Sequence, residues 1–411
     1  MRLARTEKTP RHASNKRSAA MSDDPDGKTN SFTNHTDRRE VIRRMGHSAL
    51  GAGISLGLLE TMGCADSKEN AESTHKYESR NMVEGMSYRP FGKTNLMVSR
   101  LAIGGDRWDS EVARQAISRG VNLVHGSVGY KTMENQTEAL RGMWNKIWYV
   151  LKHTGKVEDM GKTLDNCLQT TKQDHVEIMA FVVRETGVTD YEAVKAEFEQ
   201  LKQAGKVKRL GVTVHTRTVP EVCREVISSD IFDMILTMYQ PARKEAIDKE
   251  LAVAIQRNMA TMSMKTIQGI DKKDGARAIA AALASGNICT VLKGMTDLND
   301  LEEYLKIAGA SQSSLVSLGR RIRTDKTACD ACGKCTACPQ NIEIQEIMRC
   351  ATYYERESTL QDYARQTYRE IPAMATAHGC TDCGICESIC PRNLPIRQIL
   401  TDAGQKWDAI A

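Results

Sequence analysis

The chain has few aromatic residues, and its uncharged N-terminal stretch is too short to cross a membrane. Aromatic residues make up 5% of the 411 residues and hydrophobic residues 41%, so a folded core must consist mainly of aliphatic side chains. The uncharged stretch at residues 45–59 is rich in glycine and falls short of the roughly 20 apolar residues that a transmembrane helix needs. A membrane-spanning segment is therefore not predicted there.

Outside the N-terminus the chain has no excess of charge of either sign. Residues 1–44 hold 11 of the 57 Lys and Arg and 6 of the 52 Asp and Glu, so the remainder holds 46 of each sign. The net charge of +5 belongs to the N-terminal arm, and nothing in the body of the chain predicts a nucleic-acid partner.

Cysteine, in contrast, is concentrated near the C-terminus. Eight of the 13 cysteines form two clusters, each closed by a Cys-Pro pair: Cys329, Cys332, Cys335 and Cys338, then Cys380, Cys383, Cys386 and Cys390. Three cysteines at every third residue, followed by Cys-Pro, are typical of proteins that bind [4Fe–4S] clusters, in which the fourth cysteine often ligates the other cluster. We therefore expect Cys390 to join the first three cysteines and Cys338 to join Cys380, Cys383 and Cys386, which gives a two-cluster electron relay.

Two other uses of these cysteines remain as alternatives. Four-cysteine zinc sites are normally built from two CxxC pairs rather than from a triple run. Disulfide frameworks are typical of small secreted scaffolds, which a chain of 411 residues is not. Iron–sulfur binding is the favoured interpretation.

The N-terminal residues have the pattern of an export signal. The adjacent Arg38 and Arg39 precede Arg43, Arg44 and the uncharged stretch, as in a bacterial twin-arginine signal, although Glu40-Val41-Ile42 departs from that pattern. We expect residues 1–64 to be a disordered arm and signal peptide, and residues 65–85 a linker. Export to the periplasm or cell envelope follows, with membrane attachment through an acylated Cys64 as an option. A basic amphipathic arm is the alternative.

Residues 86–315 alternate between strand-like and helix-like runs. Eight such pairs, with strands of nearly continuous apolar residues such as 176–183 and 207–214, predict a closed (β/α)8 TIM barrel. Residues 316–411 would then form a small helical ferredoxin-like iron–sulfur domain. An open doubly wound sheet is the runner-up, but Gly104 and Gly105 lack the third glycine of the dinucleotide-binding fingerprint.

Several segments resemble the aldo-keto reductase family. Residues 89–101 resemble the opening of bacterial members, residues 201–212 the fourth helix and fifth strand, and residues 291–295 the eighth strand. The cysteine clusters resemble a C-terminal extension that one branch of this family carries. The resemblance implies a (β/α)8 barrel that reduces carbonyl groups with a nicotinamide cofactor.

The same resemblance implies which residues are catalytic. Tyr130 stands at the position of the proton-donating tyrosine and Lys152 at that of the lysine that lowers its pKa. His125 replaces the family's aspartate, and Val182 stands where the family has a histidine. Tyr130, Lys152 and His125 are thus the candidate catalytic residues.

Cofactor-binding residues follow in the same way. The resemblance assigns Tyr239 to stacking on a nicotinamide, with Gln240 beside it, and Gly294, Thr296 and Asn299 to binding the cofactor phosphate at a helix N-terminus. Asp297 and Asp300 make this turn acidic, which argues against NADP(H).

Three functions remain open. In the first, Tyr130 and Lys152 reduce the carbonyl of a small molecule, with the help of His125 or His153. In the second, the barrel binds a cofactor or sugar-like ligand but performs different redox chemistry, fed by the clusters from a redox partner. In the third, the barrel is a catalytically inactive scaffold for an electron-transfer protein.

Overall fold

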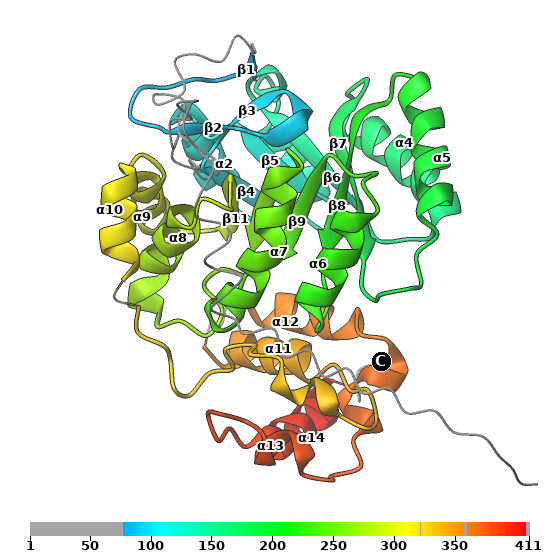
Figure 1. The fold of residues 1–411 in the computed structure, drawn as a ribbon, viewed down its shortest axis with the longest axis vertical. Helices are drawn as coiled ribbons and strands as arrows, with labels where there is room; N and C mark the ends of the chain where they lie inside the picture. The colour runs from blue at the N-terminus through cyan, green and yellow to red at the C-terminus, as the bar shows by residue number, and fades with distance from the viewer. Residues whose placement is uncertain (1–76, 321, 357–359, 408–411) are drawn as a thin grey trace, which may run out of the picture. The chain divides into compact units, whose positions relative to one another are not determined.

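The computed structural model describes residues 77–320, 322–356 and 360–407 (Figure 1). The expected signal peptide, its twin arginines and Cys64 lie outside the described residues. No helix within these described ranges is long and apolar enough to cross a membrane.

A small three-stranded sheet precedes the barrel. Its strands β1 (Glu78–Ser79), β2 (Tyr88–Pro90) and β3 (Leu96–Ser99) have the order β1-β3-β2, with β2 antiparallel to β3. Strand β1 falls within the range that the sequence assigned to a linker. Phe91, Leu96 and Val98 pack with residues from inside the barrel, so this sheet covers one end of the barrel's interior.

Eight parallel strands close into a barrel, which confirms the predicted fold (Figure 1). Each strand pairs with its two neighbours, in the order β10-β11-β4-β5-β6-β7-β8-β9. The strands are buried on both faces, which is why their sequences are apolar almost throughout. They are β4 (Leu101–Trp108), β5 (Leu123–Gly126), β6 (Trp148–His153), β7 (Val176–Val183), β8 (Val207–Val214), β9 (Met234–Met238), β10 (Ala260–Met264) and β11 (Thr290–Met295).

Helices alternate with these strands and surround the barrel. Asp109, Asp190 and Asp297 cap the N-termini of α2, α5 and α9 by accepting hydrogen bonds from backbone N–H groups, which fixes where these helices begin. The helices are α2 (Ser110–Ser118), α3 (Met133–Ala139), α4 (Met160–Thr171), α5 (Tyr191–Gln203), α6 (Val219–Ser228), α7 (Lys244–Gln256), α8 (Gly275–Ala284), α9 (Leu298–Ala308) and α10 (Gln312–Gly319).

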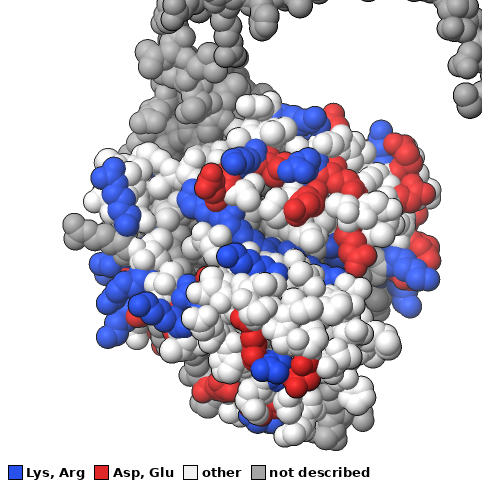
Figure 2. Space-filling view, turned by 60° about the horizontal axis from the view of Figure 1, so that its bottom comes forward, with Lys and Arg blue, Asp and Glu red and all other residues white. Residues whose placement is uncertain are grey.

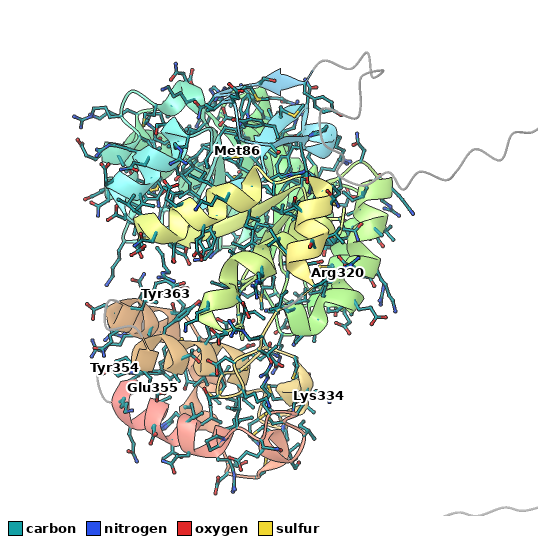
Figure 3. The ribbon with its side chains drawn as sticks, turned by 90° about the vertical axis from the view of Figure 1, so that its left-hand side faces the viewer. Met86, Arg320, Lys334, Tyr354, Glu355 and Tyr363 are labelled. Atoms are coloured by element: carbon teal, nitrogen blue, oxygen red, sulfur yellow. The ribbon has the colours of Figure 1, made fainter. Side chains whose placement is uncertain are left out.

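The C-terminal region is helical, as predicted (Figure 3). It has a hydrophobic core of its own. The ring of Trp407 packs against Tyr368 at 5.0 Å and Tyr354 at 5.6 Å between ring centroids. The four cysteines of the first cluster precede these helices, and those of the second lie between them, except for Cys386, which is inside the short third helix. The helices are α11 (Ile344–Arg356), α12 (Gln361–Arg369), α13 (Ile385–Ser388) and α14 (Ile396–Trp407).

Candidate functional site

A cavity of about 1950 Å³ opens at the carboxyl ends of the barrel strands, where active sites of this fold lie (Figure 2). Two parts of the chain line it. The barrel contributes strand-end residues, including Asp106, His125, Lys152, Thr213 and Lys265. The C-terminal region contributes Cys329, Glu346, Arg349, Tyr353, Tyr363 and Glu370. The site is therefore shared between the barrel and the cysteine-bearing region.

The three candidate catalytic residues meet in this cavity. Lys152, on β6, donates a hydrogen bond from Nζ to the Tyr130 hydroxyl at 3.4 Å. His125, on β5, has its ring centroid 6.3 Å from that of Tyr130. Parallel neighbouring strands bring these side chains together, since β5 and β6 pair through His125 and Val150.

The electrostatics of this group differ from the expectation for Tyr130. Burial raises the pKa of Tyr130 well above its usual value, and the negative charge of Asp106 acts in the same direction. The lysine therefore does not lower the pKa of Tyr130 toward neutrality, because burial and Asp106 outweigh it. Burial also lowers the pKa of Lys152, and burial together with the Lys152 charge lowers that of His125 to about 3. Tyr130 is a protonated phenol and His125 a neutral imidazole at physiological pH.

Asp106 is a carboxylate that the sequence analysis did not single out. Although burial alone would raise its pKa, a hydrogen bond from the Tyr363 hydroxyl to Oδ2 at 2.7 Å and the positive charges of Arg349 and Lys152 hold the pKa below its usual value. Tyr363 lies on α12, and Asp106 lies near the carboxyl end of β4. This contact therefore joins the C-terminal region to the barrel at the cavity.

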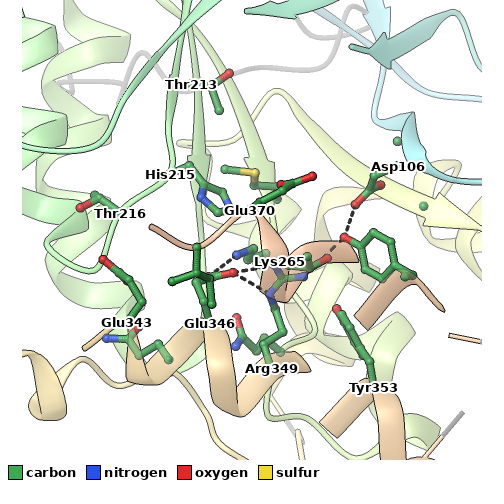
Figure 4. A pocket seen from close by; sticks show the side chains of 18 of the residues that line it. Asp106, Thr213, His215, Thr216, Lys265, Glu343, Glu346, Arg349, Tyr353 and Glu370 are labelled. Carbon is green, nitrogen blue, oxygen red and sulfur yellow. Dashed lines mark hydrogen bonds and ion pairs between the residues drawn. The ribbon is translucent and has the colours of Figure 1, made fainter. Parts of the chain in front are cut away.

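A second contact between the two regions is ionic (Figure 4). Lys265, just after β10, donates from Nζ to Oε1 of Glu346 on α11 at 2.6 Å. Arg349 donates to Oε2 of the same carboxylate from Nη2 at 2.6 Å and from Nε at 3.0 Å. Arg349 also donates to the Tyr363 hydroxyl at 3.4 Å, so the chain of contacts continues to Asp106. Burial, with the Arg349 charge, lowers the pKa of Lys265 to about 8.

His215 lies near Val182, the position at which the family resemblance leads one to expect a histidine. Val182 pairs with Thr213 on the next strand, and His215 follows two residues later. His215 lines the cavity, and its Nδ1 lies 3.3 Å from Nη1 of Arg184. Its position after the end of β8 was the available sequence signal, because functional residues of this fold follow strand ends. Glu346, Arg349 and Tyr363 gave no comparable signal.

The residues assigned to a nicotinamide cofactor are placed differently. Tyr239 is 2% exposed and donates its hydroxyl proton to Asp248 at 2.7 Å, and Gln240 is fully buried; neither lines the cavity. Gly294 does line it, whereas Thr296 and Asn299 are exposed outside it.

The helix terminus expected to hold the cofactor phosphate already has an acceptor. Asp297 Oδ1 accepts from the backbone N–H groups of Asn299 at 2.7 Å and Asp300 at 3.2 Å. A phosphate bound there would be repelled by this carboxylate and would compete with it for the same two N–H groups. These residues do not fit a nicotinamide nucleotide bound as the resemblance implies.

The eight cysteines fit two clusters with exchanged fourth ligands. Cys338, Cys380, Cys383 and Cys386 together line one small cavity. Burial, together with the charge of Asp330 and the neighbouring thiols Cys332 and Cys390, raises the pKa of Cys329 to about 11. Cys390 therefore lies with the first three cysteines and Cys338 with the second three. Within the described ranges, no three His, Cys, Asp or Glu side chains are placed to hold a single metal ion.

The two cysteine loops share one backbone conformation. Left-handed residues occur at equivalent places in each: Ala331, Gly333 and Asn341 in the first loop, and Asp382, Gly384 and Asn393 in the second. In each loop a backbone N–H points at the first cysteine sulfur, at 3.4 Å from Ala331 and 3.5 Å from Asp382. Such N–H groups stabilise thiolates, so both loops are suited to the same kind of cluster.

Comparisons with known proteins bear on both regions. Residues 328–395 match the model of the 4Fe-4S dicluster domain. A protein from Pseudomonas aeruginosa, provisionally assigned as an aldo-keto reductase, is 17% identical with a TM-score of 0.48, over 54% of this chain and 94% of its own. An aldo-keto reductase from Bacillus halodurans, in its holo form, is 15% identical with a TM-score of 0.48, over 57% of this chain and 96% of its own. No curated protein matches the chain. The chain thus carries a 4Fe–4S dicluster domain behind a closed (β/α)8 barrel.

Proposed function

We propose that this protein is an oxidoreductase that interconverts a carbonyl and an alcohol on a small molecule, with electrons passing through two [4Fe–4S] clusters. One observation carries the proposal. Cys329, a thiol of the first cluster set, lines the same cavity as Tyr130 and Lys152. A cluster held there would lie beside the substrate.

The stoichiometry of the reaction suits two one-electron carriers. Reduction of a carbonyl to an alcohol breaks the C=O π bond, forms one O–H and one C–H bond, and consumes two electrons and two protons. When bound, two [4Fe–4S] clusters supply single electrons, which a low-potential iron–sulfur or flavin protein would provide from outside. The exposed Cys383, in the second set, gives such a partner a point of approach.

The chain's own residues supply the proton chemistry. Tyr130 is protonated because burial and Asp106 keep its pKa high, so it can donate a proton to the carbonyl oxygen. Lys152 holds the phenol in place through its hydrogen bond. The second proton, which goes to carbon, comes from water in the cavity.

Export remains part of the proposal. The adjacent Arg38 and Arg39 and the uncharged stretch after them support a twin-arginine signal, and thus a periplasmic or cell-envelope location. That route carries folded proteins, which suits a protein with preloaded clusters. Attachment to the membrane through Cys64 belongs to the same proposal.

A second candidate is an electron-transfer protein whose barrel is catalytically inactive. Two observations favour it: Val182 stands where the family resemblance has histidine, and the hydroxyl of Tyr239 is engaged by Asp248 away from the cavity. In this case the cavity would bind a ligand without transforming it.

The test begins with protein purified without oxygen. We expect about eight irons per chain and a visible absorption that dithionite bleaches. Carbonyl compounds should then restore the absorption. Tyr130→Phe should slow this reoxidation without changing the iron content, and Cys332→Ala should remove about half of the iron. Tyr354→Phe, on a tyrosine outside the cavity lining, is the control.

The outcomes separate the candidates. Reoxidation at an unchanged rate in Tyr130→Phe would favour the inactive barrel. A colourless protein that contains zinc would overturn the electron relay altogether.

A further inference from the structure

An ion pair joins the two cysteine loops beside the first cluster set. Asp330 follows Cys329, the first cysteine of that set, and Arg392 lies two residues after Cys390, its expected fourth cysteine. Arg392 donates from Nε to Oδ2 of Asp330 at 2.8 Å, and the Arg392 and Asp330 side chains are 11% and 17% exposed. The pair therefore connects, across 62 residues of sequence, the two segments that must meet to complete the set.

Both partners of this ion pair are fixed by further hydrogen bonds. The Asp330 carboxylate accepts from the backbone N–H of Cys332 through Oδ1 at 3.1 Å. Arg392 donates from Nη1 to the carbonyl oxygen of Asp325 at 2.8 Å. Asp325 in turn donates its backbone N–H to the carbonyl oxygen of Gly269 at 3.1 Å. Gly269 belongs to the loop after β10, so the hydrogen bonds that hold the ion pair extend to the barrel.

The barrel also contacts the first cysteine loop directly. A Cβ on Gly269, where φ is +74°, would stand 2.4 Å from the Cα of Asp330, so the two backbones touch where a side chain would not fit. Ile270 adds an antiparallel bridge with Thr324. Asp330 is thus held from the barrel side, and through Arg392 it holds the segment that carries the fourth cysteine.

The second cluster set has uncharged residues at the equivalent positions. The two loops share one backbone conformation, so Thr381 stands at the place of Asp330 and Gln340 at the place of Arg392. Both Thr381 and Gln340 are exposed. Neither can form an ion pair, so the segment that carries Cys338 is not held to its partner loop in this way.

The ion pairs of the second loop lie within one segment. Arg397 pairs with Glu387 at 2.9 Å and with Asp382 at 3.4 Å, and all three lie on the segment that carries the other three cysteines of this set. A backbone hydrogen bond from Glu343 to Ala375 at 2.9 Å does join the two segments. It lies five residues from the nearest cysteine on each of them, whereas Asp330 is adjacent to a cysteine.

Exposure to solvent differs in the same sense. Cys383 of the second set is exposed, whereas the four cysteines of the first set, Cys329, Cys332, Cys335 and Cys390, are all partly buried. Oxidants in solution can therefore reach the second set more easily.

Charged partners beside a ligand determine how firmly it is held. Groups that orient the ligands of a metal contribute to its affinity, and the loss of one typically weakens binding about 10–100-fold. Hydrogen bonds between charged groups are stronger than those between neutral groups. The carboxylate of Asp330 alone would repel a cluster bound by four thiolates, and Arg392 neutralises this charge.

We infer that the Asp330–Arg392 ion pair holds Cys390 in place as the fourth ligand of the first cluster, and that the second cluster, without such a pair, loses iron first on oxidation. Asp330 and Arg392 are positioning residues, because they act through Cys390. The inference requires two bound clusters and does not depend on the reaction at the barrel.

Controlled oxidation of the anaerobically purified, cluster-loaded protein tests this. Ferricyanide takes one electron from a [4Fe–4S]²⁺ cluster and becomes ferrocyanide; the cluster then releases one Fe²⁺, leaves [3Fe–4S]⁺ and frees one cysteine. Electron paramagnetic resonance measures the [3Fe–4S]⁺ signal. Iodoacetamide alkylates the freed thiolate, which peptide mass spectrometry identifies. We expect alkylation in the second set first, at a rate at least about tenfold higher than in the first set.

Two reciprocal double variants exchange the residues between the sets. Asp330→Thr with Arg392→Gln gives the first set the residues of the second, and iron loss from the first set should become about tenfold faster or more. Thr381→Asp with Gln340→Arg gives the second set an ion pair and should slow its iron loss. In each protein the unaltered set is the control, because a general loss of stability would affect both sets.

Each outcome gives a decision. Equal rates of alkylation in the two sets of the parent protein, or a faster rate in the first, overturn the inference. So does the parent's pattern in Asp330→Thr/Arg392→Gln, or an equal acceleration of both sets. If this variant is purified with one cluster, alkylation of its first set before oxidation supports the inference, and alkylation of its second set overturns it. Carbonyl compounds that fail to reoxidise the clusters would overturn the proposed function and leave this inference standing.

Discussion

The guanidinium of Arg243 lies so close to Gly333 that a Cβ on this glycine would stand 1.9 Å from Nη2. Arg243 follows β9 of the barrel and is 8% exposed, whereas Gly333 is in the first cysteine loop. Arg243 is held by donating to the carbonyl oxygen of Arg217 at 2.7 Å and to Gln345 Oε1 at 3.2 Å. The barrel thus places a fixed positive charge beside one loop.

Removing this charge should lower the reduction potential of the first cluster. Reduction makes a cluster more negative, so a buried guanidinium nearby favours the reduced form. We expect Arg243→Gln to lower one of two midpoint potentials by about 60 mV, a tenfold change for one electron. A redox titration followed by electron paramagnetic resonance measures this. Arg397→Gln, at a half-exposed arginine beside the second loop that is paired with Glu387, should shift the other potential and by less, because solvent and this carboxylate screen its charge. Unchanged potentials in Arg243→Gln would contradict the prediction.

Gly333 and Gly384 should differ in their tolerance of alanine. They occupy equivalent positions with φ of +85° and +74°, so alanine costs about 1–2 kcal/mol at either for the left-handed backbone. At Gly384 the nearest atom to an added Cβ is 3.9 Å away, whereas at Gly333 it meets Arg243. We expect Gly333→Ala to lose about half of the iron and Gly384→Ala to keep nearly all of it. Equal iron contents, measured by a colorimetric assay, would contradict this.

Glu346 should be essential to the contact between α11 and the barrel. Glu346→Gln leaves Lys265 and Arg349 facing each other without a counterion, and we expect a loss of about 3–5 kcal/mol in the free energy of unfolding. Adding Lys265→Met should recover part of this loss, because the double variant no longer holds two unpaired cations. Denaturant midpoints for the two single variants and the double variant measure the coupling. Strictly additive midpoints would rule it out.

The buried His125 should make the protein less stable in acid. Its pKa is about 3 in the folded protein, against 6.5 in the unfolded chain. Between these values the unfolded chain binds the additional proton, so stability falls as the pH decreases below 6.5. At pH 5 the loss amounts to about 2 kcal/mol.

A variant isolates this contribution from other titrations. His125→Gln retains a polar side chain but does not titrate. The difference in unfolding midpoint between the parent protein and His125→Gln should change between pH 7 and pH 5, in favour of the variant. Asp106 does not interfere, because its pKa is held below 3.8 and it titrates at lower pH. A constant difference across this range would show that folding does not shift the pKa of His125.

Sequence reasoning was most accurate where one local pattern dominated. Strands 176–183 and 207–214 are observed with the predicted bounds, since long apolar runs in a buried parallel strand leave little ambiguity. Apolar residues follow Gly120 directly, yet β5 begins only at Leu123, because the chain is still completing a turn after Gly120, where φ is +99°. Spacing rules therefore located the barrel and the cysteine loops.

The shared site could not be predicted in the same way. Tyr363 and Asp106 are 257 residues apart, and neither belongs to a periodic sequence pattern from which their contact could be predicted. The same is true of Lys265 and Glu346. Tyr239 is the opposite case. The family resemblance assigned it to binding a nicotinamide, but in the structure its hydroxyl donates a hydrogen bond to Asp248. Contacts between two independently packed cores depend on surface shape, which sequence periodicity does not encode.

The exchange of fourth cysteines has a consequence for the order of synthesis. Cys329, Cys332 and Cys335 leave the ribosome early, but Cys390, which lies beside them in the folded chain, follows only after the entire second loop. The second set is complete at Cys386, because Cys338 has by then been made. The cofactor set encoded first is therefore the one completed last, and a nascent chain released before Cys390 would carry an open first site.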